Sequence, residues 1–211
     1  MTSIKILATG SDFLKEGVRG TAPVIEEIMG NIHNELHILA YVISKDADNF
    51  LKLIENALDS GVQTVLVIDN LKKQDIEVQN KLIEWNNRFD YFKLVDFNRK
   101  GKSSQMTSKY SGNCSNCGKS WNADENIFYQ KDPKVICKDK ECFEFNGGKL
   151  FQRKMLHAKV VVVDREKAVL GSANFSWGGM SAHYEVGVLL EGPEAWTLSK
   201  LVDDVANSSE T

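Results

Sequence analysis

Side chains suited to phosphoryl transfer gather between residues 157 and 174. His157 and Lys159 are two positions apart, so on an extended strand both project from the same face. A neutral imidazole nitrogen is a competent nucleophile at pH 7, and a nearby ammonium can hold a phosphate oxygen and offset charge in the transition state. The pair therefore predicts phosphoryl transfer, with His157 as the nucleophile.

Further polar groups follow at the ends of the next two predicted strands. Gly171 permits close backbone approach, and Ser172 and Asn174 can donate side-chain hydrogen bonds to phosphate oxygens. Glu185 opens a later strand, where its carboxylate could accept the other imidazole N–H of His157 and fix the tautomer. These residues form the candidate site.

The fixed positions HxKxxxxD and GSxN, which begin here at His157 and Gly171, resemble the signature of the phospholipase D superfamily. The similarity extends to about residues 21–97 and to the segment Tyr184–Val188. The resemblance implies a role for each matched position: a phosphohistidine on His157, phosphate binding by Lys159, Ser172 and Asn174, and orientation of His157 by Glu185.

Three residues in or near the motif have other expected roles. The resemblance implies a mostly structural role for Asp164, in the turn behind the site. His183 departs from the family pattern, in which asparagine is frequent two residues before the glutamate, so the local substrate contacts are expected to differ from those of the family. Trp177 could line the entrance of the site or pack beneath a tight turn.

The chain carries one copy of the motif. Members with two copies use one histidine to attack phosphorus and the other to transfer protons, and no catalytic divalent metal is needed. We therefore expect a homodimer, in which the two copies of His157 meet across a twofold axis and complete one site.

Apolar periodicity predicts the elements that position these residues. The expected strands are 4–8, 36–44, 64–68, 91–97, 160–163, 168–171 and 185–190. The expected helices are 24–32, 46–58, 75–85 and 193 to about 205. This alternation indicates an α/β fold, a mixed parallel and antiparallel sheet with helices on both faces. Residues 1–98 and 149–211 form the expected catalytic domain, and 99–148 form an insert.

All four cysteines lie in the insert. Cys114 and Cys117 are separated by two residues and Cys137 and Cys142 by four, a spacing close to that of four-thiolate zinc sites. Such a site has no open coordination position, so the sequence predicts a structural zinc in a small ribbon-like module. Unligated thiols and a redox pair remain alternatives.

Charge is distributed unevenly along the chain. Residues 99–159 hold 13 lysines and arginines against 6 acidic residues, a net charge of +7, whereas the rest of the chain carries −10. A basic segment favours a polyanionic partner such as DNA or RNA, although a solvated lysine-rich loop would look the same. Trp121, Phe128 and Tyr129 could stack on bases or form the core of the zinc module.

These features favour an endonuclease. A lipid phosphodiesterase and a nucleic-acid-binding subunit of a repair or defence complex are the alternatives. A helicase, an ATPase or a defence complex is a possible partner. No signal peptide or apolar span is evident, so we expect a cytoplasmic protein that does not bind membranes. His33 and His37 are expected to be core or surface residues, because a helical metal-binding pair would need both on one helix.

Overall fold

A computed structural model describes residues 1–98 and 100–208. The chain divides into two compact units, one comprising Met1–Phe97 with the chain from Met155 onward, the other Asn98–Lys154. Strands β6 (Lys100–Ser103) and β12 (Phe151–Arg153) pair antiparallel at the two ends of the second unit. That pairing takes this unit beyond the insert of residues 99–148 that the sequence suggests.

The first unit contains an eight-stranded mixed sheet with the order β2-β1-β15-β14-β13-β3-β4-β5. Parallel pairing joins β1 to β2, β3 to β4 and β4 to β5, and antiparallel pairing joins the other neighbours. The strands are β1 (Ser3–Thr9), β2 (Val18–Gly20), β3 (Glu35–Ala40), β4 (Gln63–Asp69), β5 (Phe92–Phe97), β13 (Lys159–Val163), β14 (Lys167–Gly171) and β15 (Glu185–Glu191).

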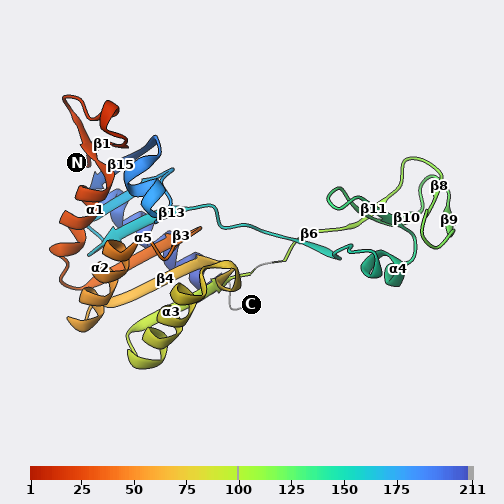
Figure 1. Cartoon of the computed structure of the whole chain (residues 1–211), viewed down its shortest axis with the longest axis horizontal. Helices are drawn as coiled ribbons and strands as arrows, with labels where there is room; N and C mark the ends of the chain where they lie inside the picture. The colour runs from red at the N-terminus through yellow and green to blue at the C-terminus, as the bar shows by residue number, and fades with distance from the viewer. Residues whose placement is uncertain (99, 209–211) are drawn as a thin grey trace. The chain divides into compact units, whose positions relative to one another are not determined.

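Helices cover both faces of this sheet, which confirms the predicted fold class. Figure 1 shows α1 (Thr21–Gly30), α2 (Asp48–Asp59) and α3 (Ile76–Arg88) along one side, and α5 (Pro193–Ser208) packs on the other. The valines of β13 alternate between the two layers, because Val161 lies in the core under α1 to α3 and Val162 lies in the core under α5. No helix in the described part of the chain is both long and apolar enough to cross a bilayer.

Strand β3 is shorter than expected, because it ends at Ala40 and not at residue 44. Beyond that point the backbone binds the Gln74 side chain and forms only an isolated parallel bridge, between Ile43 and Phe175. The Ile43 amide donates to Gln74 Oε1 at 3.2 Å, and Gln74 Nε2 donates to the Tyr41 carbonyl at 3.2 Å. Periodicity cannot reveal such pairing, since the partner lies 31 residues away.

The second unit is built from short strands around its own small core. Its sheets have the orders β11-β10-β7 and β8-β9, in addition to the β12-β6 pair. Its elements are β7 (Gln105–Thr107), β8 (Gly112–Asn113), β9 (Ser120–Trp121), β10 (Asn126–Gln130), β11 (Val135–Cys137) and α4 (Lys140–Phe145). Phe143 is fully buried in this core, with Trp121 and Ile127 nearby.

The two histidines near β3 have different environments. His33 is exposed, whereas His37 is buried beneath α5, with its Nε2 atom 3.2 Å from Asp203 Oδ1. Burial lowers the pKa of His37, and the nearby Asp203 carboxylate opposes that shift. His37 therefore belongs to the packing of α5 on the sheet.

Asp164 fixes the turn between β13 and β14. Its backbone has a positive φ of 52°, as does that of Arg165 at 59°. The Asp164 carboxylate accepts hydrogen bonds from the amides of His33, Asn34 and Glu35 at 2.9, 2.7 and 2.9 Å. Because Asp164 follows the last residue of β13 and His157 precedes the first, the two lie at opposite ends of this strand.

Removal of this carboxylate should destabilise the sheet. Asp164→Ala leaves three amides without their charged acceptor, and we expect a loss of about 2–4 kcal/mol in the free energy of unfolding. Urea unfolding followed by tryptophan fluorescence measures the change. Glu166→Ala, an exposed position in the same turn, is the control. Equal midpoints for the two variants would contradict this role of Asp164.

Candidate active site and metal site

His157 and Lys159 lie together where β13 begins. Lys159 pairs in register with Ala40, the last residue of β3, and His157 precedes the strand by two residues. The Lys159 Nζ atom lies 3.0 Å from His157 Nδ1 and 3.2 Å from Nε2. Lys159 is 6% exposed, so its ammonium is largely shielded from solvent.

Two residues that the sequence analysis missed support this pair from the ends of parallel strands. Tyr41 follows β3, and its ring centroid lies 4.5 Å from that of His157 and 5.1 Å from Lys159 Nζ. Asp69 ends β4, and its carboxylate accepts a 2.7 Å hydrogen bond from the amide of Leu156, next to His157. Both residues lie at the carboxyl ends of parallel strands, where α/β sheets bind ligands, and this position in the sequence could have indicated them.

The GSxN segment reaches the same edge of the sheet through β14 and β15. Gly171 pairs with Gly187, and a Cβ atom on Gly171 would lie 2.7 Å from the Val186 carbonyl oxygen, so only glycine fits. The Ser172 amide donates to the Val186 carbonyl at 3.0 Å, and the Ser172 hydroxyl donates to a carboxylate oxygen of Glu185. Ser172 and Glu185 are thus in direct contact.

Asn174 lies in a tight backbone contact beside this pair. A Cβ atom on Gly179 would lie 2.3 Å from the Asn174 carbonyl oxygen, so the chain after Asn174 folds back against it. Buried side-chain oxygens without a hydrogen-bond partner in the described chain include those of Asn174, Thr9 and Thr21. Thr9 pairs with Glu185, and Thr21 lines a small cavity together with Lys159. Unsatisfied buried oxygens are costly, and at this edge they are available to a polar ligand or water.

Glu185 does not take the position expected from the sequence. Its carboxylate contacts Ser172 and lies 4.0 Å from His183 Nδ1, and among the described residues no hydrogen bond joins it to His157. The structure therefore brings His157 close to Lys159, and Ser172 close to Glu185.

Electrostatics couples these two pairs. Burial lowers the pKa of Lys159 below its ordinary value of 10.5, and the negative charge of Glu185 opposes that shift. A carboxylate near a shielded ammonium favours the charged form of the lysine. The edge thus combines a nucleophilic ring, a cation and hydroxyl and amide donors, a set that can bind and attack a phosphodiester.

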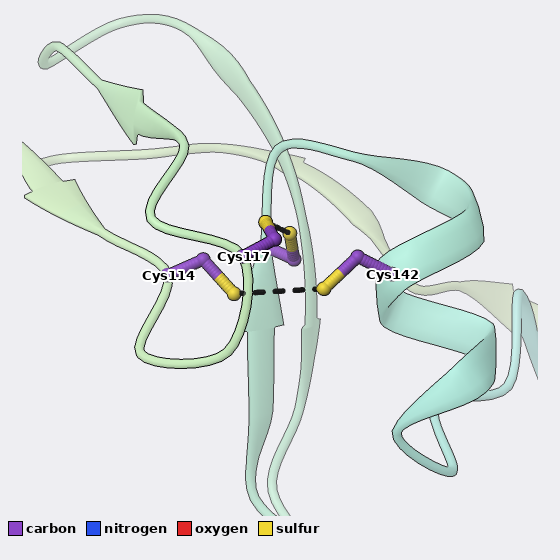
Figure 2. Close-up of side chains that lie close together, drawn as sticks. Cys114, Cys117 and Cys142 are labelled. Carbon is purple, nitrogen blue, oxygen red and sulfur yellow. Dashed lines mark hydrogen bonds between the residues drawn. The ribbon is translucent and has the colours of Figure 1, made fainter.

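The four cysteines of the second unit converge from three elements. Cys114 and Cys117 lie in the turn between β8 and β9, Cys137 ends β11, and Cys142 lies in α4. Figure 2 shows the sulfur atoms of Cys114 and Cys142 pointing toward each other. All four sulfur atoms lie within 4.8 Å of one another, with Cys117 to Cys137 at 3.4 Å and Cys114 to Cys142 at 3.8 Å.

These separations suit a tetrahedral metal. Metal–sulfur bonds of about 2.3 Å place tetrahedral ligands about 3.8 Å apart. Although burial opposes ionisation, hydrogen bonds from the amides of Cys117 and Asn116 bring the pKa of Cys114 to about 7. Burial raises the pKa of Cys137, and the positive charge of a bound cation would favour its thiolate form. The cluster could therefore hold a metal ion.

The aromatic residues of this unit divide between core and surface. Trp121 is buried, and its indole N–H donates to the Tyr110 carbonyl at 3.1 Å. Phe128 packs against Phe143 in the same core, and Tyr129 is half-buried. The structure thus favours a packing role for Trp121 and Phe128 over base stacking.

Most of the chain is similar to known proteins. A family model described as cardiolipin synthase, phospholipase D-like domain, matches residues 25–207. The DISARM protein DrmC of Bacillus paralicheniformis is 22% identical over 209 residues. That alignment covers 99% of this chain and 65% of DrmC, so the chain spans less than two thirds of the length of this relative.

Solved structures show the same fold at low sequence identity. NucT from Helicobacter pylori superposes with a TM-score of 0.59 at 13% identity, over 99% of this chain and 98% of NucT. The phospholipase D family member Nuc from Salmonella typhimurium gives 0.56 at 16% identity, over 98% and 95%. Phosphatidylserine synthase of Haemophilus influenzae gives 0.52 at 11% identity, over 99% of this chain and 39% of the synthase.

The charge state of Lys159 can be measured independently of any reaction. We expect its ε-carbon NMR signal to titrate below pH 10.5, and Glu185→Gln to lower that midpoint further by removing the opposing negative charge. The folded chain would then release this proton at lower pH than the unfolded chain, so this lysine makes stability rise with pH across that interval.

Glu166→Gln, at an exposed carboxylate beyond the far end of β13, is the control for this titration. A midpoint at or above 10.5 in the unmodified chain would contradict the lowering of this pKa by burial, and a midpoint that Glu185→Gln leaves in place would rule out the coupling to Glu185.

Proposed function

The chain belongs to the phospholipase D superfamily, and we propose that it is a metal-independent endonuclease that cleaves DNA or RNA through a phosphohistidine. The observation that carries the proposal is the placement of the Lys159 ammonium 3.0 Å from the His157 ring, at the edge where Ser172 and Glu185 meet. A nucleophile, a phosphate-binding cation and hydrogen-bond donors then act on one phosphodiester.

In the first step, a ring nitrogen of His157 attacks phosphorus. A P–N bond forms, the P–O bond to the departing part of the strand breaks, and the leaving oxygen takes a proton from a general acid. Lys159 and Asn174 hold the non-bridging oxygens while negative charge builds on them. In the second step, water gives a proton to the same acid–base group and attacks phosphorus, which breaks the P–N bond and frees His157.

The acid–base group is His157 of the partner subunit. One imidazole cannot attack phosphorus and protonate the leaving oxygen in the same step, so the reaction needs a second proton donor. In a twofold dimer the same edge of the sheet faces its own copy, and each subunit contributes one His157 to a shared site. Glu185 orients this machinery through Ser172 and through its charge on Lys159.

Two observations bear on the substrate. The net charge of +7 over residues 99–159 suits a polyanionic chain, and both Nuc-type structures match this protein over nearly their whole lengths. Phospholipid is the second candidate, since the family description and one structural relative name lipid synthases. The charge distribution favours nucleic acid, and a vesicle assay beside a nuclease assay separates the two.

The cysteine cluster holds a structural zinc, and the protein acts in the cytoplasm. Four thiolates leave no open coordination position, so this ion would stabilise the second unit and take no part in the chemistry. Reducing conditions in the cytoplasm keep the thiols available for the metal. Similarity to a DISARM protein supports the expectation that the enzyme works beside defence partners.

Loss of the nucleophile should abolish cleavage. We expect His157→Ala to lower the cleavage rate of labelled single-stranded or double-stranded DNA or RNA at least about 10³-fold, because no covalent intermediate can form. The assay is run in EDTA for times short enough to spare the zinc, with the exposed His33→Ala as the control. Activity that EDTA removes and Mg²⁺ restores would refute the mechanism.

The same variant tests the shared site. If each site needs both copies of His157, then subunit exchange between wild type and His157→Ala should reduce activity as the square of the wild-type fraction. A linear decrease would show that one subunit suffices.

Loss of one ligand should empty the metal site. Cys142→Ser is expected to lower bound zinc from one to near zero per chain by elemental analysis, and to raise amide hydrogen exchange within residues 98–154 only. Exchange in the sheet unit should stay unchanged. Ser115→Ala, between two of the cysteines, is the control. Full zinc content in Cys142→Ser would exclude a four-cysteine site.

A further inference from the structure

The chain between Asn174 and Glu185 forms one wall of a second pocket. This pocket has a volume of about 270 Å³ and lies between that segment, α1 and the start of α2. Its apolar lining includes Phe50, Leu53 and Met180, and Trp177 contributes an indole that is 59% exposed. The tryptophan is therefore not packed beneath the turn but available at the surface.

The pocket adjoins a small cavity that Lys159 lines. Ile25 and Met180 line both this pocket and that small cavity, so the two spaces share lining residues. Gly179, in the same segment, packs directly on the backbone of Asn174. A phosphodiester held at Lys159 would therefore have its neighbouring nucleotide beside the pocket.

The polar groups of the pocket select the kind of ligand that can enter. Glu26, Asp46 and Asp48 lie on its lining, and these carboxylates would repel a phosphate but accept hydrogen bonds from amino groups of a base. Asp46 already accepts a hydrogen bond from the Trp177 amide at 3.3 Å. Within the described residues, the side chains of Asp48 and Asn49 make no hydrogen bond or ion pair, so they are available for recognition.

The volume of the pocket limits the size of the ligand that can bind. Pockets for drug-sized molecules begin at roughly 300 Å³, so 270 Å³ suits one flat ring system. A base inside a duplex is stacked and paired. It cannot reach a pocket between two α-helices of the protein without leaving the duplex. An unpaired base can enter at no such cost.

We propose that this pocket binds an unpaired nucleobase next to the scissile phosphate, and that the substrate is therefore single-stranded nucleic acid. The inference rests on the proposed nuclease function and assigns its substrate class. Trp177 stacks on the base, and the free groups of Asp48 and Asn49 contact its edge.

Binding to His157→Ala, which cannot cleave, tests the pocket without the chemistry. Fluorescence anisotropy compares a labelled single-stranded DNA, the matching RNA, their duplexes and an abasic strand with the same number of phosphates. We expect the base-bearing single strands to bind more tightly than the abasic strand. Trp177→Ala should lower the ratio of the affinities for base-bearing and abasic strands about tenfold, since stacking contributes roughly 1–3 kcal/mol per base.

Two further variants make the result specific. Ser181→Trp places a bulky ring over the pocket from an exposed position and should remove the same preference without touching the core. Trp196→Ala removes an indole that is 47% exposed on α5, where it lies 4.3 Å from Lys200, and should change nothing.

An unchanged preference for bases in both Trp177→Ala and Ser181→Trp, or equal binding of duplex and single strands by the parent chain, would overturn the pocket assignment. Failure of the nuclease proposal gives a different result. In that case wild type cleaves no nucleic acid, whereas the loss of base preference in Trp177→Ala would still support the pocket.

Discussion

The candidate site depends on an ammonium held out of water beside an imidazole. Burial lowers the pKa of Lys159 and so disfavours its charge, and neighbouring groups compensate for part of that cost. The Glu185 carboxylate provides part of that compensation, and the Tyr41 ring provides a further favourable contact at 5.1 Å. In the proposed function, a phosphate bound at Lys159 would add to this compensation.

Strand register converts this electrostatic requirement into geometry. Pairing of β13 with β3 sets Lys159 beside Ala40, and the pairing of Gly171 with Gly187 sets Ser172 beside Glu185. The Asp164 carboxylate fixes the opposite end of β13 through three amides. A shift of one residue would turn Lys159 toward the other face of the sheet. The turn at Asp164 and the pairing of Gly171 with Gly187 therefore maintain the site by fixing the strand register.

Different interactions stabilise the two units. The sheet unit buries long apolar side chains under four helices, whereas the second unit gathers its small core around four cysteines. A chain segment with so few apolar residues gains little from burial, so a metal at the cysteines would supply the missing free energy. The proposed chemistry and the proposed metal are therefore separate in function as well as in sequence.

The sequence alone determined the motif residues, the alternation of strands and helices and the cysteine cluster, because each depends on local spacing. It could not place Tyr41 and Asp69 near His157, nor the pocket beside Trp177, because those contacts join segments far apart along the chain. It also paired Glu185 with His157, whereas the folded chain pairs that carboxylate with Ser172. Side-chain partners at a sheet edge are decided by how neighbouring strands pack, and only the tertiary structure sets that packing.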